Sequence, residues 1–303
     1  MPLFKKDNSK LSLIKEKSID LERDIQRLTE SNLDCVFSLE FVSSEFSLHN
    51  FRLDTLAFDK ENNSFVIIEY KRDRSFSVID QGYAYLALML NNKSDFILEY
   101  NEKTKNNLKR DDVDWTQSKV IFIANSFTSY QMNAINFKDL PIELWEVKMY
   151  DNEVVLYNQL LSQDSKESIK TITRNKTIDK VSGEVKVYTL DDHLDIPENT
   201  KNLFYALREK ILSINDSIEE RPKKNYVAYR LKNAFAYIHT QQSKIKIHLV
   251  IHKNDLNDPR DLARDVTDIG HLGGGETEVI LDSEENLNYV FDLIEQSYKK
   301  IAQ

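Results

Sequence analysis

Two carboxylates and one lysine, Asp54, Glu69 and Lys71, are the residues whose types and spacing could do chemistry. They occur in FRLDTLAFDKENNSFVIIEYK, which spans residues 51–71. Mg²⁺ is a hard ion that prefers oxygen ligands, and it is commonly held by one or two carboxylates plus water and phosphate. A lysine beside it can orient or help deprotonate an attacking water, while the metal lowers the pKa of that water. The pattern therefore predicts Mg²⁺-dependent hydrolysis of a phosphodiester, with Mn²⁺ able to substitute.

A β-hairpin would bring these side chains together. Two segments rich in β-branched and aromatic residues flank the polar turn DKENN. If the hairpin closes around Lys60–Asn63, Asp54 stands directly opposite Glu69. Lys71 lies on the same face with Arg52 opposite it, because side chains alternate along a strand. Like charges placed opposite each other destabilise a sheet, so a bound cation gives this pair a reason to exist.

The helices on either side of the hairpin add three candidates. Gln81 and Tyr85 in VIDQGYAYL are four residues apart and share one helical face, which could support a water or a phosphate oxygen. Glu22 lies near the edge of the buried face of an earlier helix that begins at Ser18.

The order Asp54, Glu69-Tyr70-Lys71, Gln81 and Tyr85, with Glu22 upstream, resembles the PD-(D/E)xK restriction-endonuclease-like superfamily. The similarity covers roughly residues 15–150, and the spacing looks most like the NucS-type branch and exonucleases with a QxxxY helix. Leu53 stands where the superfamily's name has proline. The resemblance implies that Asp54 and Glu69 are metal ligands, Lys71 is the catalytic lysine, Glu22 is an outer metal or water ligand, and Gln81 and Tyr85 are a supporting pair.

A simpler interpretation of each residue stays open. Asp54 and Glu69 could be separately solvated at an open end of the sheet, with Lys71 paired to a neighbouring aspartate. Glu22 could owe its place to the helix dipole, which favours acidic residues in a first turn. Gln81 and Tyr85 could be surface and core edge of their helix.

The elements predicted around this hairpin make a mixed α/β domain with a central sheet flanked by helices, followed by a smaller α+β domain. In the first domain we expect a helix from Ser18, strands at 36–46, 51–59 and 65–71, a helix at 77–90, a strand at 120–124, a helix at 130–137 and a strand at 142–149. In the second we expect helices at 200–212 and 285–302 and strands at 225–229, 234–239 and 244–252.

The domain boundaries follow a polar stretch rich in Ser, Thr, Lys and Asp. They predict a nuclease-like catalytic domain at 1–161, a linker at 162–195 and an accessory domain at 196–303. The accessory part resembles an uncharacterised domain often joined to nuclease-like domains in bacterial proteins. His248 and His252 share a predicted strand face without an evident third ligand. The glycines around His271 predict a tight loop with positive φ.

Composition limits the partners and the compartment. The 303 residues carry a formal charge of −9, so nucleic acid would need a local patch, for which Arg52, Arg72 and Arg74 are the candidates. One cysteine, Cys35, permits no intramolecular disulfide. No apolar stretch is long enough for a membrane span or a signal peptide. We expect a cytoplasmic protein.

Together these observations predict a nuclease that hydrolyses DNA, acting more as an endonuclease, with RNA not excluded as a substrate. A homodimer is expected to be possible, because a double-strand cut needs two sites, and the C-terminal domain could recognise a protein partner. The alternative is a catalytically silent module that binds nucleic acid or protein in a defence or regulatory assembly.

Overall fold

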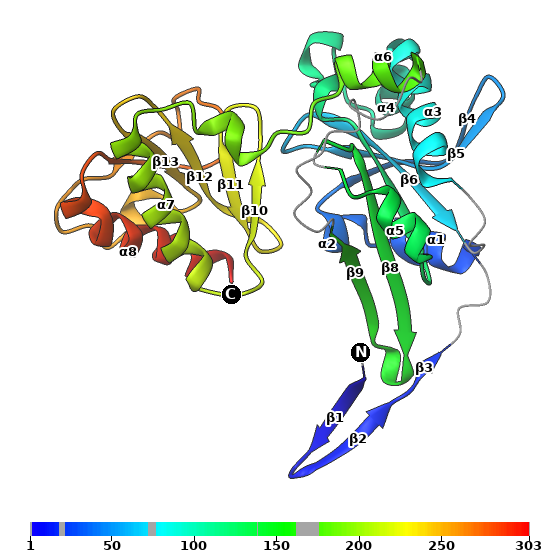
Figure 1. The fold of residues 1–303 in the computed structure, drawn as a ribbon, viewed down its shortest axis with the longest axis horizontal. Helices are drawn as coiled ribbons and strands as arrows, with labels where there is room; N and C mark the ends of the chain where they lie inside the picture. The colour runs from blue at the N-terminus through cyan, green and yellow to red at the C-terminus, as the bar shows by residue number, and fades with distance from the viewer. Residues whose placement is uncertain (1, 18–21, 72–76, 138, 162–175, 303) are drawn as a thin grey trace. The chain divides into compact units, whose positions relative to one another are not determined.

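The computed structural model describes residues 2–17, 22–71, 77–137, 139–161 and 176–302. The chain forms two compact units, Met1–Val187 and Tyr188–Gln303, and each is described by itself (Figure 1).

The first unit contains a seven-stranded sheet in the order β3-β8-β7-β6-β5-β4, with β9 pairing β8. Its strands are β3 (Glu16–Lys17), β4 (Glu40–Leu48), β5 (Phe51–Asp59), β6 (Ser64–Lys71), β7 (Lys119–Ala124), β8 (Ile142–Tyr150) and β9 (Val155–Leu160). The pairs β4–β5 and β5–β6 are antiparallel, whereas β6–β7 and β7–β8 are parallel. The predicted mixed central sheet is therefore confirmed.

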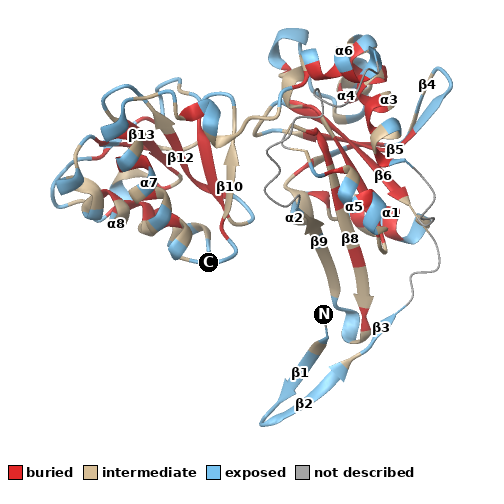
Figure 2. Cartoon of the chain, in the orientation of Figure 1, coloured by how far each residue is buried: buried red, intermediate tan, exposed pale blue. Residues whose placement is uncertain are grey.

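Helices cover both faces of this sheet. They are α1 (Glu22–Glu30), α2 (Leu33–Phe37), α3 (Val78–Asn91), α4 (Lys93–Thr104), α5 (Ser129–Ala134) and α6 (Lys176–Glu184). One core cluster joins α3, α4 and α6 to the sheet face that carries Phe65 and Ile67. A second cluster joins α1 and α2 to the opposite face, which carries Val66 and Ile68. Figure 2 shows this as buried residues along the strands and the inward sides of the helices.

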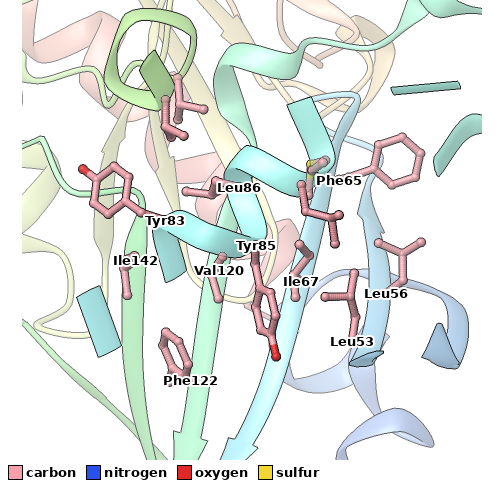
Figure 3. Close-up of a cluster of buried hydrophobic side chains, with 14 of the residues drawn as sticks. Leu53, Leu56, Phe65, Ile67, Tyr83, Tyr85, Leu86, Val120, Phe122 and Ile142 are labelled. Carbon is pink, nitrogen blue, oxygen red and sulfur yellow. The ribbon is translucent and has the colours of Figure 1, made fainter. Parts of the chain in front are cut away.

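The helix over the first face is held close to the strands. Ser77 begins α3 and accepts a hydrogen bond from the backbone N–H of Asp80 at 3.3 Å, as expected of an N-cap. Leu86 is fully buried on the inner side of the helix, and Tyr85 extends from the helix across the sheet (Figure 3). This helix is the element that brings Gln81 and Tyr85 to the hairpin.

Several predicted elements of this unit differ from those observed. The segment 36–46, predicted as one strand, instead ends α2 at Phe37 and starts β4 at Glu40, with Ser38 between them at φ 56°. The helix α4 was not predicted, and its buried Phe96 and Tyr100 are the short i, i+4 signal that marks it. The predicted start of α1 at Ser18 lies outside the described residues.

An N-terminal hairpin also lacked a prediction. The strands β1 (Leu3–Asp7) and β2 (Lys10–Ile14) form a separate two-stranded antiparallel sheet. The tight connection is made by Asn8 and Ser9, and Asn8 has a φ of 52°. Asparagine tolerates this left-handed backbone better than most residues do.

The second unit is a six-stranded antiparallel sheet in the order β10-β11-β12-β13-β15-β14. Its elements are α7 (Glu198–Ser213), β10 (Glu219–Pro222), β11 (Val227–Arg230), β12 (Ala234–Thr240), β13 (Ile245–Leu249), β14 (Arg264–Asp265), β15 (Thr277–Leu281) and α8 (Glu284–Ile301). Both helices pack on the same face of the sheet, around buried Phe204, Phe235 and Ile294.

Two expectations for the second half of the chain are wrong. Residues 176–187 were predicted as linker, but α6 buries Ile178 and Val181 in the core of the first unit. Residues 162–175, also predicted as linker, lie outside the described part of the chain. The strand predicted at 244–252 ends at Leu249, so His252 does not share a strand face with His248.

No helix among the described residues is long and apolar enough to cross a bilayer. Cys35, on α2, is exposed and is not in a disulfide.

Candidate functional site

The β5–β6 hairpin has the predicted register. Its pairs run from Asp59 with Ser64 to Thr55 with Ile68, so Asp54 and Glu69 follow immediately after the last pair. The strands part at this point, and Oδ2 of Asp54 accepts a hydrogen bond from the backbone N–H of Tyr70 at 3.0 Å. The two carboxylates therefore lie at the open end of the hairpin, within electrostatic reach of each other.

Glu69 is 4% exposed, and its Oε1 is the centre of a hydrogen-bond network. Oε1 accepts from Lys71 Nζ at 2.8 Å, from Gln81 Nε2 at 2.9 Å and from the Tyr85 hydroxyl at 3.1 Å. Gln81 also donates to the Tyr85 hydroxyl at 2.8 Å. The structure thus brings together all four of these predicted site residues, and three of them hold one oxygen of the fourth.

The other oxygen of Glu69, Oε2, is buried and has no hydrogen-bond partner. A buried carboxylate oxygen left without a partner costs free energy, and such atoms in proteins usually accompany water, an ion or a catalytic role. The preorganised Oε1 side fixes the carboxylate, and the Oε2 side is left with an unused lone pair.

Asp54 lies in an environment that opposes its negative charge. Burial, and next the charge of Glu69, raise the pKa of Asp54 to about 7, with a smaller contribution from Glu22 in the same direction. The Tyr70 N–H and Lys71 act the other way but do not compensate. A divalent cation at this position would remove the cause of the shift, because it stabilises the ionised form.

A pocket of about 750 Å³ opens at this end of the sheet. It is lined by charged and polar side chains from α1, β4, β5 and β6: Glu22, Arg23, Gln26, Glu45, Arg52, Asp54, Glu69 and Lys71. The predicted Glu22 and Arg52 are therefore in the same pocket as the hairpin carboxylates. Arg52 forms an ion pair with Glu45. Arg72 and Arg74 lie outside the described residues.

Gln26 is a site residue that the sequence patterns missed. Its Nε2 lies 3.0 Å from the backbone oxygen of Asp54, 3.1 Å from Ser44 Oγ and 3.0 Å from Glu30 Oε1. It ties α1 to β4 and β5 at the point where Asp54 leaves the ladder. Its spacing of four residues from Glu22 was the available signal, because residues four apart share a helical face.

The donor set fits a hard divalent cation held by few protein ligands. In the described part of the chain, no three Asp, Glu, His or Cys side chains are grouped so that they could hold a metal ion. Asp54 and Glu69 remain as a pair of oxygen ligands, with Oε2 of Glu69 unpartnered. Mg²⁺ commonly binds through one or two carboxylates and completes its shell with water and phosphate, so two ligands suffice.

Comparison with known proteins gives a family for the chain and a domain for its second unit. Residues 190–300 match the family model DUF5655, described as a domain of unknown function. The chain is 44% identical over 301 residues to an uncharacterized protein of Haemophilus influenzae, covering 99% of this chain and 100% of that protein. The chain therefore belongs to the same family as the H. influenzae protein.

Three solved structures show a weaker likeness. A repair endonuclease from Pyrococcus abyssi has a TM-score of 0.23 at 16% identity, covering 40% of this chain and 45% of that one. An EndoMS–dsDNA complex has 0.23 at 18%, covering 43% and 47%. Pyrococcus furiosus SfsA with Ca²⁺ has 0.25 at 13%, covering 52% and 68%. The chain thus spans less than half of either endonuclease, and scores this low carry no functional argument.

Proposed function

We propose that this protein is a metal-dependent nuclease that hydrolyses DNA phosphodiester bonds, with a first unit of the restriction-endonuclease-like, NucS-type kind. One observation carries the proposal. Glu69 is buried with one oxygen held by Lys71, Gln81 and Tyr85 and the other unpartnered, beside an aspartate whose pKa is raised to about 7. A structural role leaves this costly arrangement unexplained, whereas a cation ligand explains both carboxylates.

In this proposal Asp54 and Glu69 hold Mg²⁺, or Mn²⁺ in its place, with Glu22 as an outer ligand of the metal or a water. The ion, when bound, lowers the pKa of the attacking water and offsets charge on the phosphate. Gln81 and Tyr85 keep the Glu69 carboxylate in one orientation. Lys71 places an ammonium group beside that carboxylate, where it can orient the water and stabilise the negative charge of the transition state.

Contacts with the DNA backbone belong to Arg52, Arg72 and Arg74 in this proposal. Arg52 lies in the pocket and its side chain is 67% exposed, so it can leave Glu45 for a phosphate. Few such contacts and an overall charge of −9 predict modest, salt-sensitive binding. The expected homodimer and a protein partner for the second unit remain part of the proposal.

The rival function keeps the fold without catalysis, as a module that binds nucleic acid or protein. It is favoured by the charge of −9 and by the ion pair that occupies Arg52.

Cleavage assays separate the two functions. Purified full-length protein is incubated with single-stranded, branched, mismatched and duplex DNA and with RNA, in Mg²⁺, Mn²⁺ or chelator. We expect metal-dependent cutting of DNA that Lys71→Ala abolishes. Lys299→Ala, which removes an exposed lysine paired with Glu295 on α8, is the matched control and should cut normally.

Circular linear-ended comparison then assigns the mode of cutting. Cleavage of closed circular DNA as well as linear DNA identifies an endonuclease, whereas cleavage of linear DNA alone identifies an exonuclease. Wild-type protein that binds DNA or RNA but cuts none of the substrates would overturn the enzymatic proposal and favour the binding module.

A further inference from the structure

A second cluster of chemistry-bearing side chains lies in the other unit, on the sheet face opposite α7 and α8. Three histidines meet there: His239 on β12, His248 on β13 and His271 in the loop between β14 and β15. The rings of His239 and His248 are 4.9 Å apart between centroids, and those of His248 and His271 are 4.3 Å apart. The cross-strand neighbours Tyr226 and Tyr237 border the cluster.

Each imidazole is oriented through one of its two nitrogens. His239 Nδ1 lies 3.1 Å from the backbone oxygen of Asn225, and His271 Nδ1 lies 2.7 Å from that of Ile269. Because a carbonyl oxygen can only accept, both nitrogens carry the hydrogen. His248 Nε2 lies 3.2 Å from Oε2 of Glu278. A histidine that binds a metal typically donates its second N–H to a carbonyl or a carboxylate in this way.

The remaining nitrogen of each ring is buried without a partner: Nε2 of His239, Nδ1 of His248 and Nε2 of His271. In the neutral imidazole this nitrogen carries a lone pair. Burial is the largest cause that lowers the pKa of His239 to about 4, and it also lowers that of His248. Three neutral rings thus gather three unsatisfied acceptors in one place, and groups of this kind call for an ion, a water or a proton.

The ring spacing fits one of these. Imidazoles that share a tetrahedral Zn²⁺ at about 2.0–2.1 Å have ring centres roughly 5 Å apart. The observed 4.3 and 4.9 Å are close to that value. The rings do not yet converge, because no three such side chains among the described residues are grouped to hold an ion as they stand. Small rotations of the rings are therefore required.

The loop that carries His271 is built to lie on the other two strands. Gly273 and Gly275 have φ values of 82° and 113°, which favour glycine. A Cβ at Gly274 would meet the Tyr237 hydroxyl at 2.7 Å, and one at Gly275 would meet Cβ of His248 at 3.0 Å. The glycines let the backbone approach closely, and the positive φ predicted for this loop is confirmed at two of them.

We propose that His239, His248 and His271 bind one divalent transition metal ion of the Zn²⁺ class, with Glu278 as the carboxylate that orients His248. Glu278 is itself held by Lys246 at 3.1 Å and Arg264 at 2.8 Å, which fixes its position. Three protein ligands leave a fourth position for water or a ligand. This site is independent of the proposed nuclease site, whose oxygen ligands suit a harder ion.

The test is titration of chelator-treated full-length protein with Co²⁺, whose visible absorption reports coordination by nitrogen ligands, followed by displacement with Zn²⁺. We expect one equivalent bound, a rise in Tm with Zn²⁺, and loss of the absorption in His271→Ala. Because His271 lies in a loop, this variant is expected to fold. Glu278→Gln should weaken binding about 10- to 100-fold.

Two control variants make the result specific. His252→Ala removes a histidine of the same unit that contacts Asp265 outside the cluster, and it should bind Co²⁺ normally. Glu69→Gln should also leave Co²⁺ binding at this site unchanged. Wild-type protein that gains neither absorption nor Tm would overturn the proposal and leave a buried water or a shared proton as the partner of the three nitrogens, as would equal binding by His271→Ala.

Discussion

At the scale of single residues, the two oxygens of Glu69 have different partners, and this difference can be tested. Replacing Glu69 by Gln keeps the shape of the side chain but removes its charge and one of its two acceptor oxygens. We expect Mn²⁺ affinity in the pocket to fall at least about 10-fold and DNA cleavage to be lost. The free energy of unfolding should stay equal or rise, because a buried charge next to Asp54 is removed. Calorimetric titration and denaturant unfolding measure the two effects.

A matched control comes from the same sheet. Glu143 on β8 pairs with Lys119 at 2.6 Å and is outside the pocket lining. Glu143→Gln should leave metal affinity and cleavage unchanged. Equal loss of metal binding in both variants would show that the effect is structural rather than specific to Glu69.

The raised pKa of Asp54 gives the metal-free protein a specific pH dependence. Between the ordinary pKa of 3.8 and about 7, the folded chain retains a proton that the unfolded chain has released. Stability therefore falls as pH rises through this window, by about 1–4 kcal/mol. We expect wild type without divalent ions to be less stable at pH 8 than at pH 5, relative to Asp54→Asn. Urea unfolding at both pH values measures the difference.

Asp54→Asn cannot ionise, so this contribution to the pH dependence should disappear and the variant should exceed wild type in stability at pH 8. Adding Mg²⁺ should reduce the difference by stabilising only the wild type. Parallel pH profiles for the two proteins would contradict the assignment of the shift to Asp54.

The residues of the site were largely predictable because the hairpin register follows from a short turn. Once DKENN connects the strands, Asp54, Glu69 and Lys71 are placed by alternation, and the observed pairs have that register. Gln26 and the histidine cluster were not predictable in this way. Their partners lie on other elements, so their contacts depend on how helices and strands pack in three dimensions.

At the scale of elements, α3 positions the supporting pair because a glycine lets it approach the sheet. A Cβ at Gly82 would lie 2.5 Å from Cδ1 and 2.9 Å from Cγ1 of Ile142 (Figure 3). Gly82→Ala should therefore displace the helix, lower stability by about 1–3 kcal/mol and reduce cleavage by moving Gln81 and Tyr85 from Glu69. Thermal unfolding and cleavage rates measure the two effects.

Two further variants test this explanation. Gly183→Ala on α6 has open space around its Cβ and should be neutral or up to about 1 kcal/mol stabilising. Ile142→Val removes Cδ1, so adding it to Gly82→Ala should restore part of the lost stability and activity. A double variant no better than Gly82→Ala would contradict the steric explanation.

Elements with strong periodicity or a clear cap were predictable, whereas those fixed by packing were not. The helix at Ser77 and the two helices of the second unit have observed bounds close to those expected. The short α6 lies in a polar stretch and was predicted as linker. Its buried Ile178 and Val181 gain their meaning only from contact with the first core, which a local pattern does not encode.

At the scale of the whole molecule, the two units have separate cores. Each hydrophobic cluster found among the described residues draws its members from one unit only. Leu293→Ala on α8 should cost about 2–5 kcal/mol in the second unit and leave the first unit's transition unchanged. Calorimetry with hydrogen exchange of individual segments measures this, and equal destabilisation of both units would show that they unfold as one.

The position of β6 in the sheet has a consequence for how the chain folds. Its antiparallel partner β5 is reached through the short loop Lys60–Asn63, whereas its parallel partner β7 begins only at Lys119. Local pairing forms with less entropy lost than distant pairing, so we expect the hairpin to form first. The two like-charged carboxylates would then meet before α3 supplies Gln81 and Tyr85. Cation in the refolding buffer should consequently speed the folding step itself.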